Sequence, residues 1–166
     1  MIETDRLVLA PMGLEDASFV LELVNTKEWI DNIGQRDVYT VTDAEQYIQD
    51  KMIGHYDQYG YGNYLMTTKA DGTKVGCVSL YNRPDVDGID IGFALLPHYF
   101  RKGYAYEGAK AILRHAAETL EIGTICAFTS KENVASQGLI SKLGLRYDSI
   151  LLFGDEQEEL LYYKTE

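Results

Sequence analysis

The sequence predicts a single mixed α/β domain. Three observations support this prediction. Some segments repeat apolar residues at helical spacing, others read as β-strands bounded by turn residues, and no linker, repeat or low-complexity stretch divides residues 1–166. A chain of 166 residues has the ordinary length of one domain and can bury a sizeable core.

The N-terminal part is predicted to form one strand followed by helices. Residues 6–10, "RLVLA", favour a strand. Residues 14–24 repeat apolar side chains at helical spacing, and residues 26–34, "TKEWIDNIG", favour a second, short helix. Thr42 followed by Glu45 forms a capping box, which predicts the start of a third helix.

In the central part the apolar pattern changes to that of strands. Residues 63–82 read as two strands around Asp71 and Gly72, a dipeptide that strongly indicates a hairpin. Residues 88–97, "GIDIGFALLP", favour a third strand that ends at Pro97. This part is therefore predicted to form an antiparallel core of the sheet.

The C-terminal part alternates helices and strands. Helical spacing runs over residues 103–120, and residues 124–130, "TICAFTS", favour an apolar strand. Residues 132–144 favour a helix with Gly144 as its C-cap, and residues 145–164 favour a closing hairpin. The whole order predicts a mixed, mostly antiparallel sheet of six to seven strands, flanked by helices.

The composition argues against several classes of function. The formal net charge is -11, so a basic face for nucleic acid is not expected; the acidity favours either solubility or attraction of a cationic amine. No run approaches the roughly 18 apolar residues of a membrane helix, and no secretory signal opens the sequence. Cys77 and Cys126 are expected to be buried free thiols, and no metal-ligand spacing occurs. We therefore expect a cytoplasmic protein without a membrane partner or a metal.

The stretch "LLPHYFRKGYAYEGAKAIL", residues 95–113, places Arg101, Lys102 and Gly103 between a strand and a helix. Backbone N–H groups at a helix N-terminus lack intrahelical partners, and glycine lets a ligand approach the backbone closely. The turn therefore either caps the helix or binds a phosphate or pyrophosphate. It is neither a P-loop nor a dinucleotide-binding loop, because the glycine spacing of both motifs is absent.

Three blocks resemble the GNAT N-acetyltransferase superfamily. Residues 100–105 match the acyl-CoA-binding pattern Q/R-x-x-G-x-G/A, with Phe100 in the first place. An aromatic residue there is common in the branch that resembles ribosomal-protein-alanine N-acetyltransferases. Residues 2–17, "IETDRLVLAPMGLEDA", and residues 131–148, "KENVASQGLISKLGLRYD", resemble two further blocks of that branch. The resemblance therefore implies one N-acetyltransferase domain over residues 1–166.

The resemblance also implies acetyl-CoA as the cofactor. In the family, a bulge in the strand before the turn opens a V-shaped split between the fourth and fifth strands, where the pantetheine arm lies. The implied cofactor-binding residues are Leu95, Leu96 and Asn133 for the arm, and Arg101, Lys102, Gly103, Tyr104 and Ala105 for the pyrophosphate. Asn133 also fits a second interpretation, as a helix-start residue beside a turn.

For catalysis, the resemblance places Asp90 as the candidate general base. A carboxylate can accept the proton of the amine when burial raises its pKa; alternatively, Asp90 faces water on a half-exposed sheet. Many family members use a tyrosine as general acid at the position of Ile140. Ser136 matches the serine that this branch carries, and either protonates the CoA sulfur or only packs against the cofactor.

The acceptor pocket is implied by the same resemblance. In the family, the early helices and the strand after them wall this pocket, so its candidate residues are Trp29, Asn32, Arg36, Tyr64 and Asn82. Strands are naturally rich in tyrosine, so a purely structural role stays open for Tyr64.

The sequence therefore predicts an acetyl-CoA-dependent N-acetyltransferase, a monomer or homodimer. It would move the acetyl group directly to the primary amine of a peptide N-terminus or of a small amine. The alternative is a non-catalytic acyl-CoA-binding sensor or regulatory module of the same fold, which the isoleucine at position 140 favours.

Overall fold

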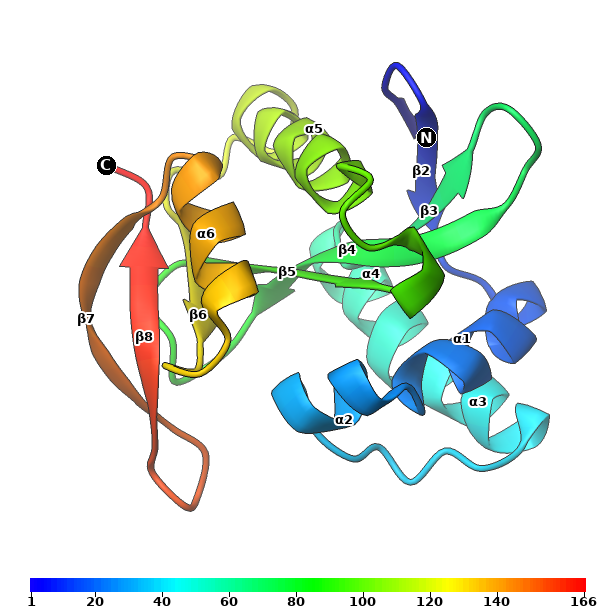
Figure 1. Cartoon of the computed structure of the whole chain (residues 1–166), viewed down its shortest axis with the longest axis horizontal. Helices are drawn as coiled ribbons and strands as arrows, with labels where there is room; N and C mark the ends of the chain where they lie inside the picture. The colour runs from blue at the N-terminus through cyan, green and yellow to red at the C-terminus, as the bar shows by residue number, and fades with distance from the viewer.

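The computed structural model describes residues 1–166 as one eight-stranded sheet with helices on both faces (Figure 1). The strands are β1 (Ile2–Glu3), β2 (Leu7–Pro11), β3 (Asn63–Thr68), β4 (Lys74–Asn82), β5 (Ile89–Leu95), β6 (Ile125–Thr129), β7 (Arg146–Phe153) and β8 (Glu158–Lys164). The helices are α1 (Ala17–Val24), α2 (Lys27–Asn32), α3 (Val41–Tyr47), α4 (Gly54–Tyr59), α5 (Tyr104–Glu118) and α6 (Val134–Lys142), with 3₁₀ turns at Leu14–Asp16 and Pro97–Tyr99 and a π-helical segment at Ile48–Ile53. The predicted mixed α/β class is confirmed.

The strand order in the sheet is β1-β2-β3-β4-β5-β6-β8-β7. Neighbouring strands are antiparallel, except that β5 and β6 run parallel. The sheet has one strand more than the seven expected, because Ile2 and Glu3 pair with Leu9 and Val8 as the short strand β1. None of the helices has the length and apolar character needed to cross a membrane.

The two faces of the sheet bury two separate apolar clusters. On one face, α5 and α6 pack Ile112 and Ile140 against strand residues such as Leu80. On the other face, α1 to α3 and the π-helical segment pack residues such as Val20 and Ile48 against β3 and β4. Alternate residues of each central strand point to opposite faces, which explains why the strands are apolar on both sides.

Helix α3 begins two residues before the predicted position, so the proposed capping box at Thr42 and Glu45 is wrong. The N-cap is Thr40, whose hydroxyl accepts a hydrogen bond from the Asp43 amide at 3.1 Å. The Asp43 carboxylate accepts in return from the amides of Thr40, at 2.9 Å, and Tyr39, at 3.0 Å. These bonds lower the pKa of Asp43. The Asp43 carboxylate thus accepts from two backbone amides, which explains why Thr40 and Asp43 form the cap in place of Thr42 and Glu45.

The expected split between the fourth and fifth long strands is present, but its cause differs from the expected one. Strands β5 and β6 pair only at Ile89 with Ile125 and at Asp90 with Cys126. Beyond Asp90, β5 continues to Leu95 without a partner on that side. No bulge interrupts β5, whose pairing with β4 is regular throughout. The strands therefore separate because β6 diverges from a regular β5.

Candidate active site

The turn between β5 and α5 presents an unbroken row of backbone donors. Arg101 has φ +60° and Gly103 has φ +83°, and the helix starts at Tyr104. The amide N–H groups of residues 101–106 donate no hydrogen bond to any carbonyl or side chain of the protein. Six adjacent free donors at the positive end of a helix of 15 residues form a site suited to a phosphate group.

The basic side chains of this turn reinforce that character. Arg101 and Lys102 are both exposed, and neither forms an ion pair with an acid. The Lys102 ammonium group lies 5.3 Å from the centre of the Tyr99 ring, a cation–π contact. Both charges are therefore available to an anion.

Glu107 holds this turn to the N-terminal strands, an arrangement that sequence reasoning missed. Its carboxylate accepts hydrogen bonds from the Thr4 hydroxyl at 2.6 Å, the Arg6 amide at 2.8 Å and the Arg6 Nε–H at 2.7 Å. Arg6 also donates to the Lys102 carbonyl at 2.9 Å and lies 4.6 Å from the centre of the Tyr104 ring. Partial burial acts to raise the pKa of Glu107, but these hydrogen bonds outweigh it and lower the pKa. Glu107 and Arg6 thus fix the backbone that carries the free amides.

Glu107→Gln is expected to reduce both the stability of the fold and the affinity for a phosphate ligand at the turn. Glutamine would lose the negative charge. Its side-chain N–H group would also face an N–H group of Arg6, which cannot accept a hydrogen bond. We expect the free energy of unfolding to fall by about 1–3 kcal/mol, toward the lower end because Arg6 is half exposed. Urea unfolding measures the first effect and acetyl-CoA titration the second. The control is Glu118→Gln on the same helix, and equal behaviour of the two variants would contradict the prediction.

The open side of β5 offers further backbone groups. The Ile89 amide donates toward β6, to Thr124 at 3.1 Å, whereas the Leu96 amide donates toward β4, to Val75 at 3.0 Å. Amides alternate in direction along a strand, so those of Phe93 and Leu95 point into the split, where no partner strand lies. The Leu95 side chain packs with the α5 face and that of Leu96 with the opposite face. An extended polar chain can therefore bind along β5 by strand-like hydrogen bonds.

Helix α6 lines the other side of the split, next to β6 (Figure 1). Asn133 is its N-cap, since the side-chain oxygen accepts from the Ser136 amide at 3.2 Å. The Asn133 amide nitrogen and the Ser136 hydroxyl have no partner within the protein and remain available to a ligand. Ile140, one turn further, is buried in the core. Asn133 thus has the capping role considered above and retains a free donor.

Asp90 lies at the point where β5 and β6 separate. Its side chain is 9% exposed, and one carboxylate oxygen accepts the Nε–H of Arg83 at 2.9 Å. Burial raises the pKa of Asp90, while the Arg83 guanidinium opposes this rise. Arg83 itself lies over the rings of Tyr81 and Phe128, at 5.3 and 5.6 Å from their centres. A buried carboxylate with an elevated pKa, at the end of the split, accepts a proton more readily than an exposed aspartate does.

A family model described as an acetyltransferase (GNAT) domain matches residues 6–146. The chain belongs to this GNAT family. It is therefore an acetyltransferase. The N-acetyltransferase YnaD of Bacillus subtilis strain 168, named as uncharacterized, is 24% identical over 166 residues, which cover 98% of this chain and 94% of that protein.

Two solved structures share the fold of this GNAT chain. The ribosomal-protein-S5-alanine acetyltransferase from Vibrio fischeri aligns with a TM-score of 0.80 at 15% identity, over 98% of this chain and 94% of that chain. The spermidine N-acetyltransferase from Vibrio cholerae, in complex with CoA and spermine, aligns with a TM-score of 0.79 at 14% identity. The alignment covers 97% of this chain and 95% of that chain. The first belongs to the branch that the sequence blocks resemble.

The five residues implied for the acceptor pocket of this GNAT domain are not all brought together. Trp29 lies in α2, where its side chain is buried, and its indole N–H has no acceptor. Asn32 and Arg36 are exposed at and after the end of α2, and Asn82 is exposed at the end of β4. Tyr64 lies instead in the core on the α5 side, with its hydroxyl unpaired. The structure therefore separates Tyr64 from Trp29, which packs in the apolar cluster on the opposite face of the sheet.

His55 is a further polar residue near Asn82. Its Nε2 accepts from the Asn82 amide at 3.2 Å, so Nδ1 carries the proton and donates to the Tyr61 carbonyl at 2.9 Å. Burial lowers the pKa of His55, and nearby Arg83 adds to this effect. The imidazole is thus held neutral, and it ties α4 to β4.

The neutral state of His55 predicts a loss of stability on acidification. An unfolded histidine has a pKa of about 6.5, and the folded value is lower, so the unfolded chain binds more protons below that pH. The contribution of His55 to the free energy of unfolding is expected to be constant above pH ~6.5. It should fall as the pH decreases from there to the pKa of His55 in the folded protein. Urea unfolding of wild type and His55→Gln at several pH values measures the difference, which should shrink in acid. His98→Gln, at an exposed site, is the control; a constant difference would contradict the prediction.

Proposed function

We propose that the protein transfers an acetyl group from acetyl-CoA directly to a primary amine of a peptide N-terminus or a small molecule. The observation that supports this best is the row of six free amides at residues 101–106, which continues into the unpaired side of β5. A phosphate site joined to a strand-like groove fits a ligand with a pyrophosphate and an amide-containing arm, as in coenzyme A.

Different residues are suited to hold the pyrophosphate and the arm of acetyl-CoA, and they adjoin one another as these two parts of the cofactor do. The amides of residues 101–106, with Arg101 and Lys102, would bind the pyrophosphate. The backbone of β5 up to Leu95, with Asn133 opposite, would bind the arm. When bound, acetyl-CoA supplies the activated acetyl thioester. The amide of Leu95 or Phe93 would then polarise the carbonyl oxygen as a preorganised donor.

Two side chains are proposed for the proton transfers. The Asp90 carboxylate, already buried and held by Arg83, would accept the proton that the acceptor amine must lose. The free hydroxyl of Ser136 would deliver a proton to the leaving sulfur. A direct transfer needs no covalent link to the protein, which agrees with the buried state of both cysteines.

The test is a titration with acetyl-CoA followed by an acceptor panel. Calorimetry should detect binding of acetyl-CoA, and peptides and small amines should then release free thiol at rates above the hydrolysis blank. Absence of binding at millimolar acetyl-CoA would refute the proposal. Binding without thiol release from any amine would instead favour the non-catalytic sensor.

A further inference from the structure

We propose that the acceptor nitrogen binds over Gly92, where it donates one hydrogen bond to the Ser79 hydroxyl and gives its proton to Asp90. The inference rests on the proposed function, since it places the acceptor of the same transfer. The observation behind it is an opening in the face of the sheet that α1 to α3 otherwise cover. Ser79 and Gly92 lie in the middle of the sheet and are only half-buried. Asn63 and Cys77, beside Ser79, are buried.

The strand register places the three proposed residues on one face. Ser79 is directly opposite Gly92 in the ladder of β4 and β5, and Tyr81 is opposite Asp90. Residues that lie opposite each other, or two apart on one strand, point to the same face of a sheet. Cys77 belongs to the same alternation and packs in the apolar cluster of α1 to α3, which identifies the face. Diagonal neighbours such as Ser79 and Asp90 lie roughly 7–8 Å apart, so an amine between them can contact both.

Gly92 leaves a space over β5 that the Ser79 hydroxyl borders. A Cβ added at Gly92 would lie 3.0 Å from Ser79 Oγ, and no other atom beyond the adjacent residues would lie within 4 Å of it. By contrast, a Cβ added at Gly76, on the same pair of strands, would lie 2.2 Å from the Ala94 carbonyl oxygen. The space is therefore particular to Gly92.

The backbone of Gly92 does not itself require glycine. Its φ is not positive, and its pairing with β4 is regular. Glycine inside a strand weakens the strand, and it often occurs where a ligand approaches the backbone closely. Gly92 thus has the position and the surroundings of a residue that makes room for a ligand.

Two polar groups at this space are free to accept hydrogen bonds. The Ser79 hydroxyl has no partner within the protein, and one carboxylate oxygen of Asp90 accepts only the Arg83 Nε–H, at 2.9 Å. The second oxygen of Asp90 accepts no hydrogen bond. A primary ammonium group has three N–H donors and suits such a pair of acceptors. One N–H bond breaks and its proton forms an O–H bond on Asp90, while a second N–H keeps its hydrogen bond to Ser79.

The hydroxyl of Tyr81, on the same face, is already occupied. It accepts from the side-chain amide of Asn63 at 2.7 Å and donates to the Lys51 carbonyl at 3.2 Å. These bonds hold the π-helical segment Ile48–Ile53 beside the opening. The hydroxyl that stays available to an amine there is therefore that of Ser79.

The space over Gly92 also adjoins the unpaired side of β5. The next residue is Phe93, whose amide points into the split where the pantetheine arm is proposed to lie. An amine over Gly92 would therefore lie beside the site proposed for the acetyl group.

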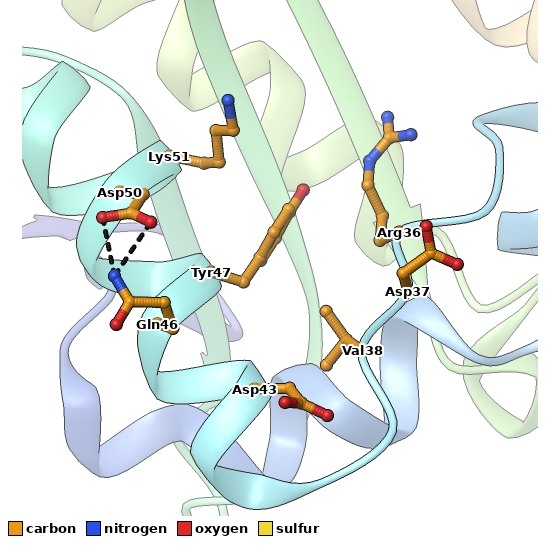
Figure 2. A pocket seen from close by; sticks show the side chains of 8 residues that line it. All are labelled: Arg36, Asp37, Val38, Asp43, Gln46, Tyr47, Asp50 and Lys51. Atoms are coloured by element: carbon orange, nitrogen blue, oxygen red, sulfur yellow. Dashed lines mark hydrogen bonds between the residues drawn. The ribbon is translucent and has the colours of Figure 1, made fainter.

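The cavity next to the π-helical segment is less suited to recognise the amine. It has a volume of about 250 Å³, and Figure 2 shows that Tyr47 and Lys51 extend into it from the helical side. Its lining mixes three carboxylates with two cations and therefore favours neither charge. Recognition of the amine thus falls to Ser79 and Asp90.

The test is an NMR titration of the ¹⁵N-labelled protein saturated with CoA. The probes are alanine amide, which resembles a peptide N-terminus, and spermidine, a small amine. At least one of them should shift the backbone resonances of Ser79, Gly92 and Asp90. Propionamide, which is alanine amide without its amine, should shift none of the three.

Two variants then separate the proposed contacts. Gly92→Ala fills the space with a methyl group and should raise the Kd of the amine about tenfold or more, with unchanged affinity for CoA. Ser79→Ala removes one acceptor and should raise this Kd about tenfold, the effect of one hydrogen bond to a charged group. The matched controls are Gly123→Ala, where nothing lies within 4 Å of the added Cβ, and Ser149→Ala in β7. Both controls should keep the wild-type Kd.

Two outcomes would overturn the inference: no shift at Ser79 and Gly92 with either amine, or wild-type affinity for the amine in Gly92→Ala or Ser79→Ala. Thiol release from acetyl-CoA with the same amines tests the proposed function separately. Binding of an amine over Gly92 without thiol release would refute only the acetyl transfer. Thiol release at the wild-type rate in Gly92→Ala would refute only the inference.

Discussion

Replacing Gly103 by valine is expected to weaken acetyl-CoA binding by at least about a hundredfold. Gly103 has φ +83°, and a Cβ there would lie 3.1 Å from Nη2 of Arg6. The branched side chain would strain the turn and cover the free amides beside it. Each hydrogen bond to a charged phosphate contributes about 1.5–3 kcal/mol, so the loss of two accounts for the stated effect. Calorimetric titration with acetyl-CoA measures it.

The matched control for this variant is Gly154→Val. Gly154 has a similar φ of +72°, in the turn between β7 and β8, and nothing lies within 4 Å of a Cβ added there. Both variants should lose about 1–2 kcal/mol of stability to backbone strain, but only Gly103→Val should lose affinity. Wild-type affinity in Gly103→Val would place the pyrophosphate elsewhere.

Asp90→Asn is expected to lower kcat by 10²- to 10⁴-fold, the usual contribution of a general base. Asparagine keeps the size of the side chain and an oxygen to accept the Arg83 Nε–H, so the fold should remain intact. The wild-type rate should increase as the pH rises through the pKa of Asp90, which burial places above the ordinary aspartate value. Steady-state kinetics over a range of pH should show this increase in rate with pH in the wild type and not in Asp90→Asn.

Asp85→Asn removes an exposed carboxylate from the loop before β5 and serves as the control for Asp90→Asn. Its kcat should equal that of the wild type. Full activity of Asp90→Asn would mean that another group or an ordered water accepts the proton.

The sequence predicted best those features that neighbouring residues determine. The hairpin at Asp71 and Gly72 and the start of α5 after Gly103 follow from turn residues and caps, which act within a few positions. The start of α3 was misplaced by two residues because two Thr-x-x-acid pairs overlap there, and the Tyr39 amide, outside either pair, favours Thr40.

Contacts between distant parts of the chain could not be predicted in this way. Glu107 is separated by about a hundred positions from Thr4 and Arg6, and no local pattern indicates that pairing. The presence of Arg6 in a block that resembles the family was the one available signal. The family resemblance placed Tyr64 in the acceptor pocket. Strand β3 is buried on both faces, so its sequence does not reveal which way the ring points.

The short pairing of β5 with β6 divides the sheet into two blocks, β1 to β5 and β6 to β8, joined along only two residue pairs. Such a joint is a weak point for thermal opening, because few backbone hydrogen bonds resist separation of the blocks. A cofactor arm bound between the two blocks would form hydrogen bonds with both of them and hold them together. Acetyl-CoA should therefore raise the unfolding temperature and slow amide exchange in β6 as well as in the turn that holds its phosphates.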